Sequence, residues 1–147
     1  MWRGMGQAEL DKLIASGQIE RVLPDPDTAR EDLAMARNHI KAALMIADVD
    51  PTLAFTGLYD AMRKSIQAHM RTNGYRTTRG LGAHIKIGAY AEAALDELGI
   101  GEHLEEFEQL RITRNQSEYS GIFATGEDVA AASGHAVAIV EAIAGAL

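Results

Sequence analysis

Apolar residues in this chain recur at helical spacing between short segments that break helices. Leucine, isoleucine and alanine follow one another three or four positions apart at Leu33, Ala36, Ile40, Leu44 and Ala47, and the same spacing returns over residues 53–70. Asp50 and Pro51 separate the two runs, and this pair is typical of an N-cap followed by the first helical residue. A period of 3.6 residues puts such side chains on one face of a helix. The sequence therefore predicts two antiparallel helices that bury these faces against each other.

Capping residues and glycines divide the rest of the chain in the same way. Thr28 and Glu31 form the pattern of a capping box, and Thr125 with Asp128 forms a similar pair. Gly74 suits the left-handed position that follows a helix. Helices are expected over residues 8–19 (short, interrupted by a glycine), 28–47, 51–73, 83–98, 101–120 and 127–145, with a basic, glycine-containing loop over 75–82.

Composition supports a helical fold. Apolar residues make up 47% of the 147 positions and aromatic residues only 5%, with many alanines and few β-branched runs. The predicted fold class is all-α: one domain over residues 1–147, in which 27–147 form an up-and-down bundle of five to six helices and 1–23 form an arm or short helix. The absence of cysteine excludes disulfides and thiolate zinc sites and is compatible with the cytoplasm.

The sequence predicts neither a membrane-spanning helix nor a metal site. The apolar segment 129–147 carries Ser133, His135 and Glu141, so we expect a packed helix and no membrane span. The five histidines show no His-x-x-x-His spacing, so no metal or other cofactor is predicted. The glycines of residues 79–83 lack the Lys-Ser/Thr ending of a phosphate-binding loop.

Charge is distributed unevenly along the chain. The formal net charge is −7, which argues against a general nucleic-acid coat protein. Between Asp60 and Glu92, however, all charged side chains are basic, and between Glu92 and Glu108 all are acidic. These segments are either solvated faces, a basic rim for phosphates, or complementary patches between two subunits.

The most unusual helix is predicted over residues 101–120. Leu104 and Phe107 fall on the same side as Arg111, Asn115 and Glu118, so an apolar face continues as a polar one. Long charged side chains are costly to bury without partners. Either the helix leaves the core at this point, or these groups converge on a polar cleft.

The pattern Arg111-x-x-Arg114-Asn115-x-x-x-Tyr119 resembles the signature helix of the HEPN superfamily, and the segments 59–63 (Tyr-Asp-Ala-Met-Arg) and 74–76 (Gly-Tyr-Arg) extend the resemblance. This family consists of helical domains that usually dimerise. Many are metal-independent ribonucleases of toxin–antitoxin and phage-defence systems, and others bind nucleotides or act as non-catalytic partners. Its motif is an arginine, a polar residue, a few spacers and a histidine. Here Tyr119 stands at the histidine position.

The resemblance implies a role for each residue of the motif. Arg114 would stabilise the transition state, Asn115 would position the ribose or phosphate, and Tyr119 would stand in for the missing histidine. Because a tyrosine with a reference pKa of about 10 is a poor base, we expect weak or absent RNA cleavage. Arg111, Arg76 and Arg79 are expected to bind phosphate or a nucleotide. Asp60, Arg63 and Glu118 are expected to support the site by orienting its side chains.

Other readings of the same residues stay open. Arg114 and Glu118 can simply pair with each other, and the polar stripe can form a two-fold interface without catalysis. His84 or His69 can replace the missing histidine from another helix. The expected function is thus a cytoplasmic, HEPN-like domain of a toxin–antitoxin or phage-defence type system. It would be a homodimer that binds RNA, a nucleotide or a cognate antitoxin or partner protein, without contact to a membrane. The alternative is a non-catalytic dimerisation or partner-binding module.

Overall fold

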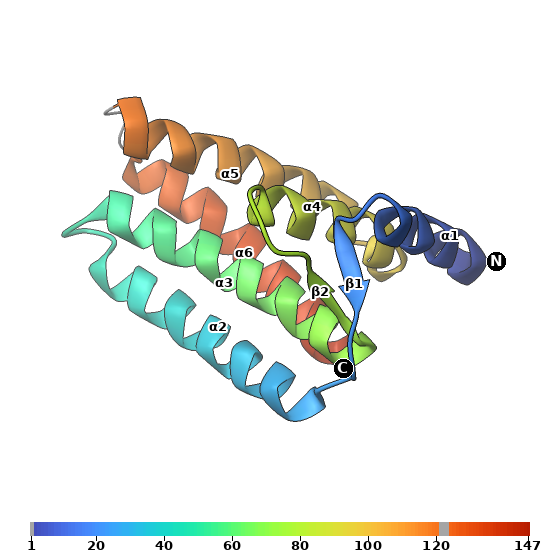
Figure 1. Ribbon diagram of the computed structural model, residues 1–147. Helices are drawn as coiled ribbons and strands as arrows, with labels where there is room; N and C mark the ends of the chain where they lie inside the picture. The colour runs from blue at the N-terminus through green and yellow to red at the C-terminus, as the bar shows by residue number, and fades with distance from the viewer. Residues whose placement is uncertain (1, 121–123) are drawn as a thin grey trace.

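The computed structural model describes residues 2–120 and 124–147, and the side chains of residues 6–112 and 124–147. The described residues form an all-α bundle with six α-helices, which confirms the predicted fold class (Figure 1). The elements are α1 (Trp2–Ala15), β1 (Ile19–Arg21), α2 (Pro26–Ile46), α3 (Pro51–Asn73), β2 (Tyr75–Thr77), α4 (Ala83–Ala94), the 3₁₀ turn η1 (Asp96–Leu98), α5 (Gly101–Ser120) and α6 (Gly126–Ala146).

Helix α3 is the centre of the bundle. Eleven of its residues are buried, and it packs against α2, α4, α5 and α6. Its largest fully buried side chains are Tyr59, Leu58, Met62, Ile66 and Met70. In α2, Ala43 is buried, whereas Leu44 is 53% exposed, so the expected place of Leu44 in the core is wrong. The apolar stripe of α2 runs through Ile40 and Ala43 at a spacing of three, which turns Leu44 outward.

Local capping explains four helix ends. The Asp50 side chain accepts a hydrogen bond from the Leu53 backbone N–H, as predicted, and Thr125 and Asp128 form the predicted capping box. Gly74 closes α3 with φ 79°, which glycine adopts without strain. The predicted capping box at Thr28 is wrong, because Asp25 caps α2 by accepting from the Thr28 N–H. Pro26 then occupies the first turn, so the helix begins earlier than expected.

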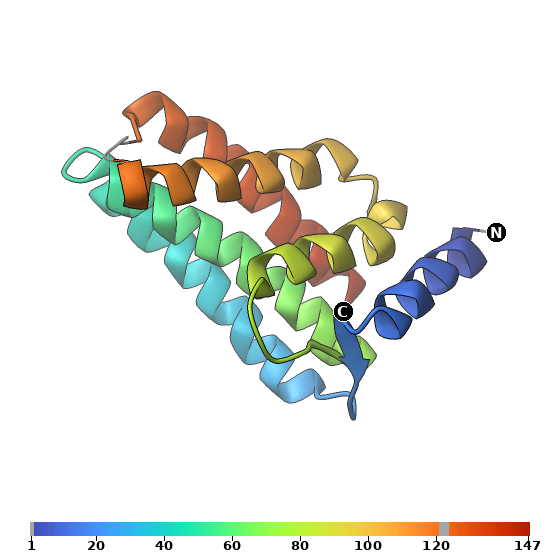
Figure 2. The same ribbon diagram turned by 45° about the horizontal axis from the view of Figure 1, so that its top comes forward.

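A small antiparallel hairpin joins distant parts of the chain. Strand β1 pairs with β2 in the register Ile19↔Thr77, Glu20↔Arg76 and Arg21↔Tyr75. Residues 75–77 were expected to be loop, because their strand partner lies more than fifty positions earlier and leaves no local signal. The segment after β2 turns back toward the middle of the bundle, so α4 runs in the same direction as α3 (Figure 2).

Helix α6 is long and apolar enough to cross a membrane by length and composition. In this structure one face of α6 packs on α2, α3 and α5. That face carries the residues Val129, Ala132, Ala136, Ile139, Val140 and Ile143, all of which are buried.

Candidate functional site

Helices α3, α4 and α5 meet at a buried tyrosine. Tyr59 on α3 is fully buried, and its ring stacks on Phe107 of α5, with 5.1 Å between ring centroids and 4° between planes. Its hydroxyl lies 2.9 Å from Nδ1 of His84, the second residue of α4. One side chain therefore ties together three helices that are distant in sequence, and we call this place the three-helix junction.

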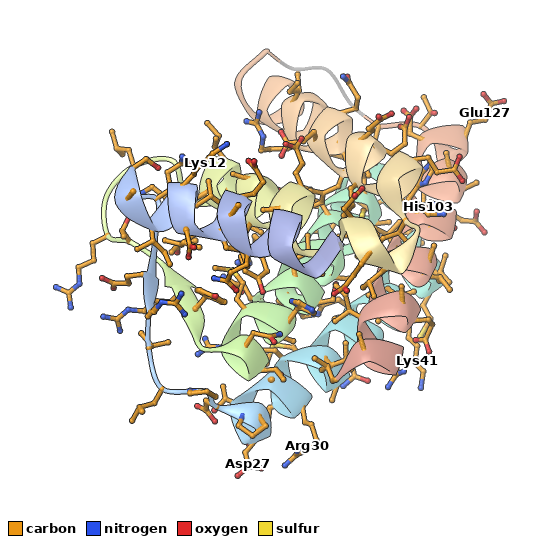
Figure 3. The ribbon with its side chains drawn as sticks, turned by 90° about the vertical axis from the view of Figure 1, so that its right-hand side faces the viewer. Lys12, Asp27, Arg30, Lys41, His103 and Glu127 are labelled. Carbon is orange, nitrogen blue, oxygen red and sulfur yellow. The ribbon has the colours of Figure 1, made fainter. Side chains whose placement is uncertain are left out.

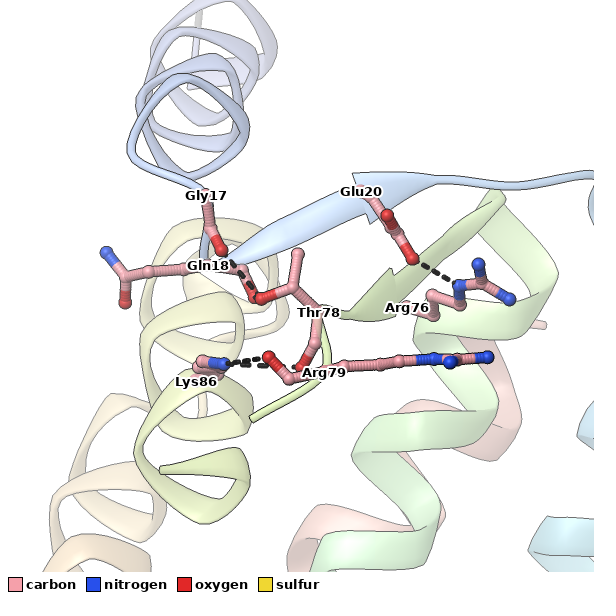
Figure 4. Close-up of polar contacts among 7 residues, drawn as sticks. All are labelled: Gly17, Gln18, Glu20, Arg76, Thr78, Arg79 and Lys86. Atoms are coloured by element: carbon pink, nitrogen blue, oxygen red, sulfur yellow. Dashed lines mark hydrogen bonds and ion pairs between the residues drawn. The ribbon is translucent and has the colours of Figure 1, made fainter. Parts of the chain in front are cut away.

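The loop before α4 brings His84 to this junction. Gly80 and Gly82 have φ values of 109° and 84°, which other residues adopt with strain. Lys86 on the first turn of α4 donates hydrogen bonds to the carbonyl groups of Thr78 and Arg79, at 3.2 and 3.5 Å. These contacts hold the returning loop against the helix that it precedes (Figure 4).

Two half-buried ion pairs flank the junction. On α3, Nε of Arg63 lies 3.6 Å from Asp60, and on α5, Nε of Arg111 lies 3.2 Å from Glu108. Both arginine side chains are largely shielded, with 22% and 19% exposure. Partial burial strengthens the electrostatic interaction within such a pair and raises the cost of a charge that has no close partner.

Arg63 is the less well satisfied of the two arginines. Its Nε is buried and has no hydrogen-bond partner within the described part of the chain. Its Nη1 is 3.5 Å from Oε1 of Gln67, at the outer limit for a hydrogen bond. A guanidinium whose protein partners lie this far away keeps N–H groups that can donate hydrogen bonds to a phosphate oxygen.

Gly88 lets α4 and α5 approach closely. The carboxylate of Glu108 occupies the space that a side chain at position 88 would fill. The same carboxylate pairs with Arg111. Gly88 and Glu108 belong to different helices, so no local pattern in the sequence indicates their contact.

A surface groove lies one turn beyond Arg63 on α3. Gln67 and Arg71 follow at helical spacing, and together with Arg76 of β2 they line a surface cavity of about 340 Å³. Arg71 pairs with Asp32 at 2.7 Å, and Arg76 pairs with Glu20 at 2.5 Å. Each groove arginine is thus positioned by a carboxylate from a neighbouring element.

The predicted phosphate-binding residues do not all come together. Arg111 lies at the three-helix junction, whereas Arg76 lies in the α3 groove on the strand. Arg79 is exposed in the loop and forms no ion pair with a described residue. In Figure 4 the side chains of Arg76 and Arg79 extend to the same side of the hairpin. The sequence missed Gln67 and Arg71, although their spacing of four from Arg63 already places them on its face.

The central motif residues lie at the far end of α5. Arg114, Asn115, Glu118 and Tyr119 belong to this helix, but their side chains are outside the described part of the chain. Their assigned roles therefore stay predictions. Asp60 and Arg63, predicted as supporting residues, do lie together as an ion pair.

The two histidines considered as replacements for the motif histidine have different positions. His84 is at the three-helix junction, half-buried and hydrogen-bonded to Tyr59. His69 lies ten residues beyond Tyr59, about 15 Å along α3, and bonds to Tyr90 instead. Within the described residues, no group of three or more histidine and acidic side chains is arranged to hold a metal ion.

Comparison with models of protein families, with curated proteins and with solved structures finds no match to this chain.

Proposed function

We propose that this protein is a HEPN-like domain of a toxin–antitoxin or phage-defence type system that binds RNA or nucleotide phosphates at the three-helix junction. The observation that carries the proposal is a group of contacts at this junction: the ion pair of Arg111 with Glu108, the stacking of Phe107 on Tyr59, and the hydrogen bond between Tyr59 and His84. Arg111, one turn before the motif arginine Arg114, and a histidine from another helix both lie within one helical turn of residues of this junction. The family motif combines arginine and histidine, and here α4 supplies a histidine, His84, to the three-helix junction.

Chemistry at such a site needs no metal. In RNA cleavage of this kind, the ribose 2′-oxygen attacks the adjacent phosphorus, a base takes its proton, and the 5′-oxygen leaves with a proton from an acid. Arginines stabilise the charge that develops on the phosphoryl oxygens. Because Tyr119 replaces the motif histidine and His84 is held by Tyr59, we expect binding to exceed cleavage.

Binding is tested by fluorescence anisotropy of a short labelled RNA at low salt. Arg63→Gln and Arg111→Gln should each weaken binding about tenfold, or ~1.4 kcal/mol, with a shallower dependence on salt. Arg37→Gln is the matched control, since Arg37 of α2 pairs with Glu141 of α6 at 2.9 Å, away from the junction. Equal affinities for all four proteins would refute RNA binding at the junction.

Cleavage is tested with the same RNA in EDTA, using Arg114→Ala, Tyr119→His and His84→Ala. We expect little cleavage by the parent and a gain in Tyr119→His. Strong parent cleavage that disappears in Arg114→Ala would establish a nuclease and contradict the expected inactivity. If cleavage also disappears in His84→Ala, then His84 of α4 acts in place of the motif histidine.

The alternative, a non-catalytic dimerisation or partner-binding module, has support on α6. Val137 is 46% exposed on the outer face of this helix, beside the exposed small residues Ala130, Ala131 and Gly134. Small residues allow two helices to approach closely. If a homodimer forms here, Val137→Glu should make it monomeric in light scattering, while the control Val49→Glu at the α2–α3 turn should not.

A further inference from the structure

A pair of histidines joins α5 to α6. His103 is the third residue of α5, and His135 lies in the middle of α6. Their Nδ1 atoms are 2.8 Å apart, and their ring centroids are 5.1 Å apart with 60° between the ring planes. Figure 3 shows His103 at the side of the molecule where the start of α5 lies next to α6. Neither histidine belongs to the three-helix junction.

The short distance between the two Nδ1 atoms restricts where the protons of the pair can be. A hydrogen bond between two imidazole nitrogens needs one N–H donor and one unprotonated acceptor. With both rings neutral, one ring therefore carries its proton on Nδ1 and the other on Nε2. The bond also persists after one added proton, because an imidazolium donates to Nδ1 of a neutral ring. With both rings protonated, two N–H groups face each other, so the bond is lost and two positive charges lie close together.

A carboxylate beside the pair offsets part of this repulsion. Oε1 of Glu102 lies 3.7 Å from Nε2 of His103, and the Glu102 side chain is 84% exposed. Solvent weakens the interaction of so exposed a charge. The first turn of a helix also disfavours a positive charge, and His103 lies in the first turn of α5. Glu102 therefore compensates a single protonated ring better than it compensates two.

The other charged groups around the pair are mostly acidic. Asp96 and Glu97 form part of η1 directly before α5, Glu106 lies one turn beyond His103, and Asp128 lies two turns before His135 on the same side of α6. In Figure 3, Lys41 of α2 and Glu127 of α6 lie on opposite sides of His103. On α3, Arg63 pairs with Asp60. Because carboxylates themselves become neutral below about pH 4, their compensation declines as the solution becomes more acidic.

Helix α5 has few buried attachments near the pair. Among its described side chains, those of residues 101–112, only Leu104 and Phe107 are buried. Helix α3, by comparison, has eleven buried residues. Segments with few buried apolar contacts open locally at a lower free energy than the centre of a domain. The loss of one polar contact therefore matters more at the start of α5 than it would in α3.

We propose that His103 and His135 form a pH switch, which holds the first turns of α5 on α6 while at least one ring is neutral and releases them when both rings are protonated. Release would expose Leu104 and Phe107 to water and separate Phe107 from Tyr59, on which it stacks. Histidines suit this role because an ordinary imidazole changes its charge between about pH 5 and about pH 8. The inference does not rest on the proposed function, since it concerns how α5 is held and not what binds to it.

Hydrogen exchange measured by NMR on the full chain tests the switch. The protection factors of the amides of residues 104–110, relative to those of α3, should fall about tenfold between about pH 8 and about pH 5. In His103→Gln this ratio should stay constant, because glutamine can bond to His135 and does not take up a proton. His135→Gln should give the same result as His103→Gln. His39→Gln, at a half-buried histidine of α2, is the matched control and should behave like the parent.

The positions of the ring protons give a second test. In ¹H–¹⁵N spectra at about pH 8, at least one ring of the pair should carry its proton on Nδ1. Both rings in the Nε2–H form would contradict the hydrogen bond and overturn the proposal. A constant ratio of α5 to α3 protection in the parent would also overturn it, as would an equal fall in His103→Gln. These outcomes leave phosphate binding untouched, because the RNA titrations with Arg63→Gln and Arg111→Gln test it separately.

Discussion

Two tyrosine–histidine pairs lie in this bundle, and both use the same atoms. The Tyr59 hydroxyl lies 2.9 Å from Nδ1 of His84, and the Tyr90 hydroxyl lies 2.8 Å from Nδ1 of His69. Both tyrosines are fully buried. The histidines differ, since His84 is half-buried at the start of α4 and His69 is buried near the end of α3.

Their surroundings differ even more. The shielded cations Arg63 and Arg111 lie one helical turn from Tyr59 and Phe107, whereas the second pair lies beside Glu97 and the ring of Tyr75. The same hydrogen bond thus lies near basic side chains in one case and near an acidic side chain in the other. Charge and burial around a pair, more than the pair itself, decide its chemistry.

The largest effect should come from removing the aromatic support of the first pair. Phe107 is fully buried, so Phe107→Ala should lower the free energy of unfolding by about 3–5 kcal/mol. Phe55→Ala, at a buried phenylalanine of α3, should cost a similar amount. Only Phe107→Ala should shift the ring signals of His84 in NMR spectra. A loss of unfolding free energy below about 1 kcal/mol for Phe107→Ala, or equal shifts of the His84 signals in both variants, would contradict a specific role of Phe107 in supporting this pair.

The second pair should make stability depend on pH. The pKa of His69 is about 4 in the folded protein against 6.5 in the unfolded chain, so the unfolded chain binds the proton more readily. Stability from this group is complete above pH 6.5 and falls as the pH drops toward 4, by roughly 3 kcal/mol in all. Denaturant titrations at several pH values measure this loss.

His69→Gln is the control for that loss, because glutamine does not titrate. The difference in stability between parent and variant should shrink across this window as the pH falls. His103 and His135, whose Nδ1 atoms are 2.8 Å apart, are present in both proteins and cancel in the difference. A constant difference from pH 7 to pH 4 would contradict the buried, neutral His69.

The smallest effect distinguishes the two tyrosine hydroxyls. Tyr90→Phe leaves a buried Nδ1 with only the distant Asn73 amide, so it should cost about 1–3 kcal/mol. Tyr59→Phe should cost less, about 0.5–1.5 kcal/mol, because half-buried His84 is closer to solvent. Urea unfolding of both variants measures the two costs. A larger cost for Tyr59→Phe would reverse the order of burial inferred for the two histidines.

The sequence predicted those parts of the fold that depend on neighbouring residues. Asp50 caps α3, Gly74 ends it in the left-handed conformation, and Thr125 with Asp128 starts α6, as expected. These contacts join a side chain to backbone within three or four positions. The prediction of Thr28 as the N-cap of α2 is wrong, because Asp25 caps the helix. Both side chains are able to cap a helix, and which of them does so depends on where the helix begins.

The candidate site was predicted only in part. The ion pair of Asp60 with Arg63 spans three positions on one helix, and the sequence indicated it. The pairing of Tyr59 with His84, the fit of Glu108 against Gly88, and the strand partner of Arg76 join residues that lie 20 to 56 positions apart. No local sequence pattern predicts contacts between residues so far apart in the chain.

Helical spacing, caps and glycines determined by themselves that this chain forms a helical bundle and where most helices begin and end. They act through side-chain and backbone groups within one turn, so the sequence alone is sufficient for them. The tertiary structure decided which tyrosine meets which histidine and which arginines are shielded from water. Those properties depend on burial and on charges from several helices, which exist only after the helices have packed.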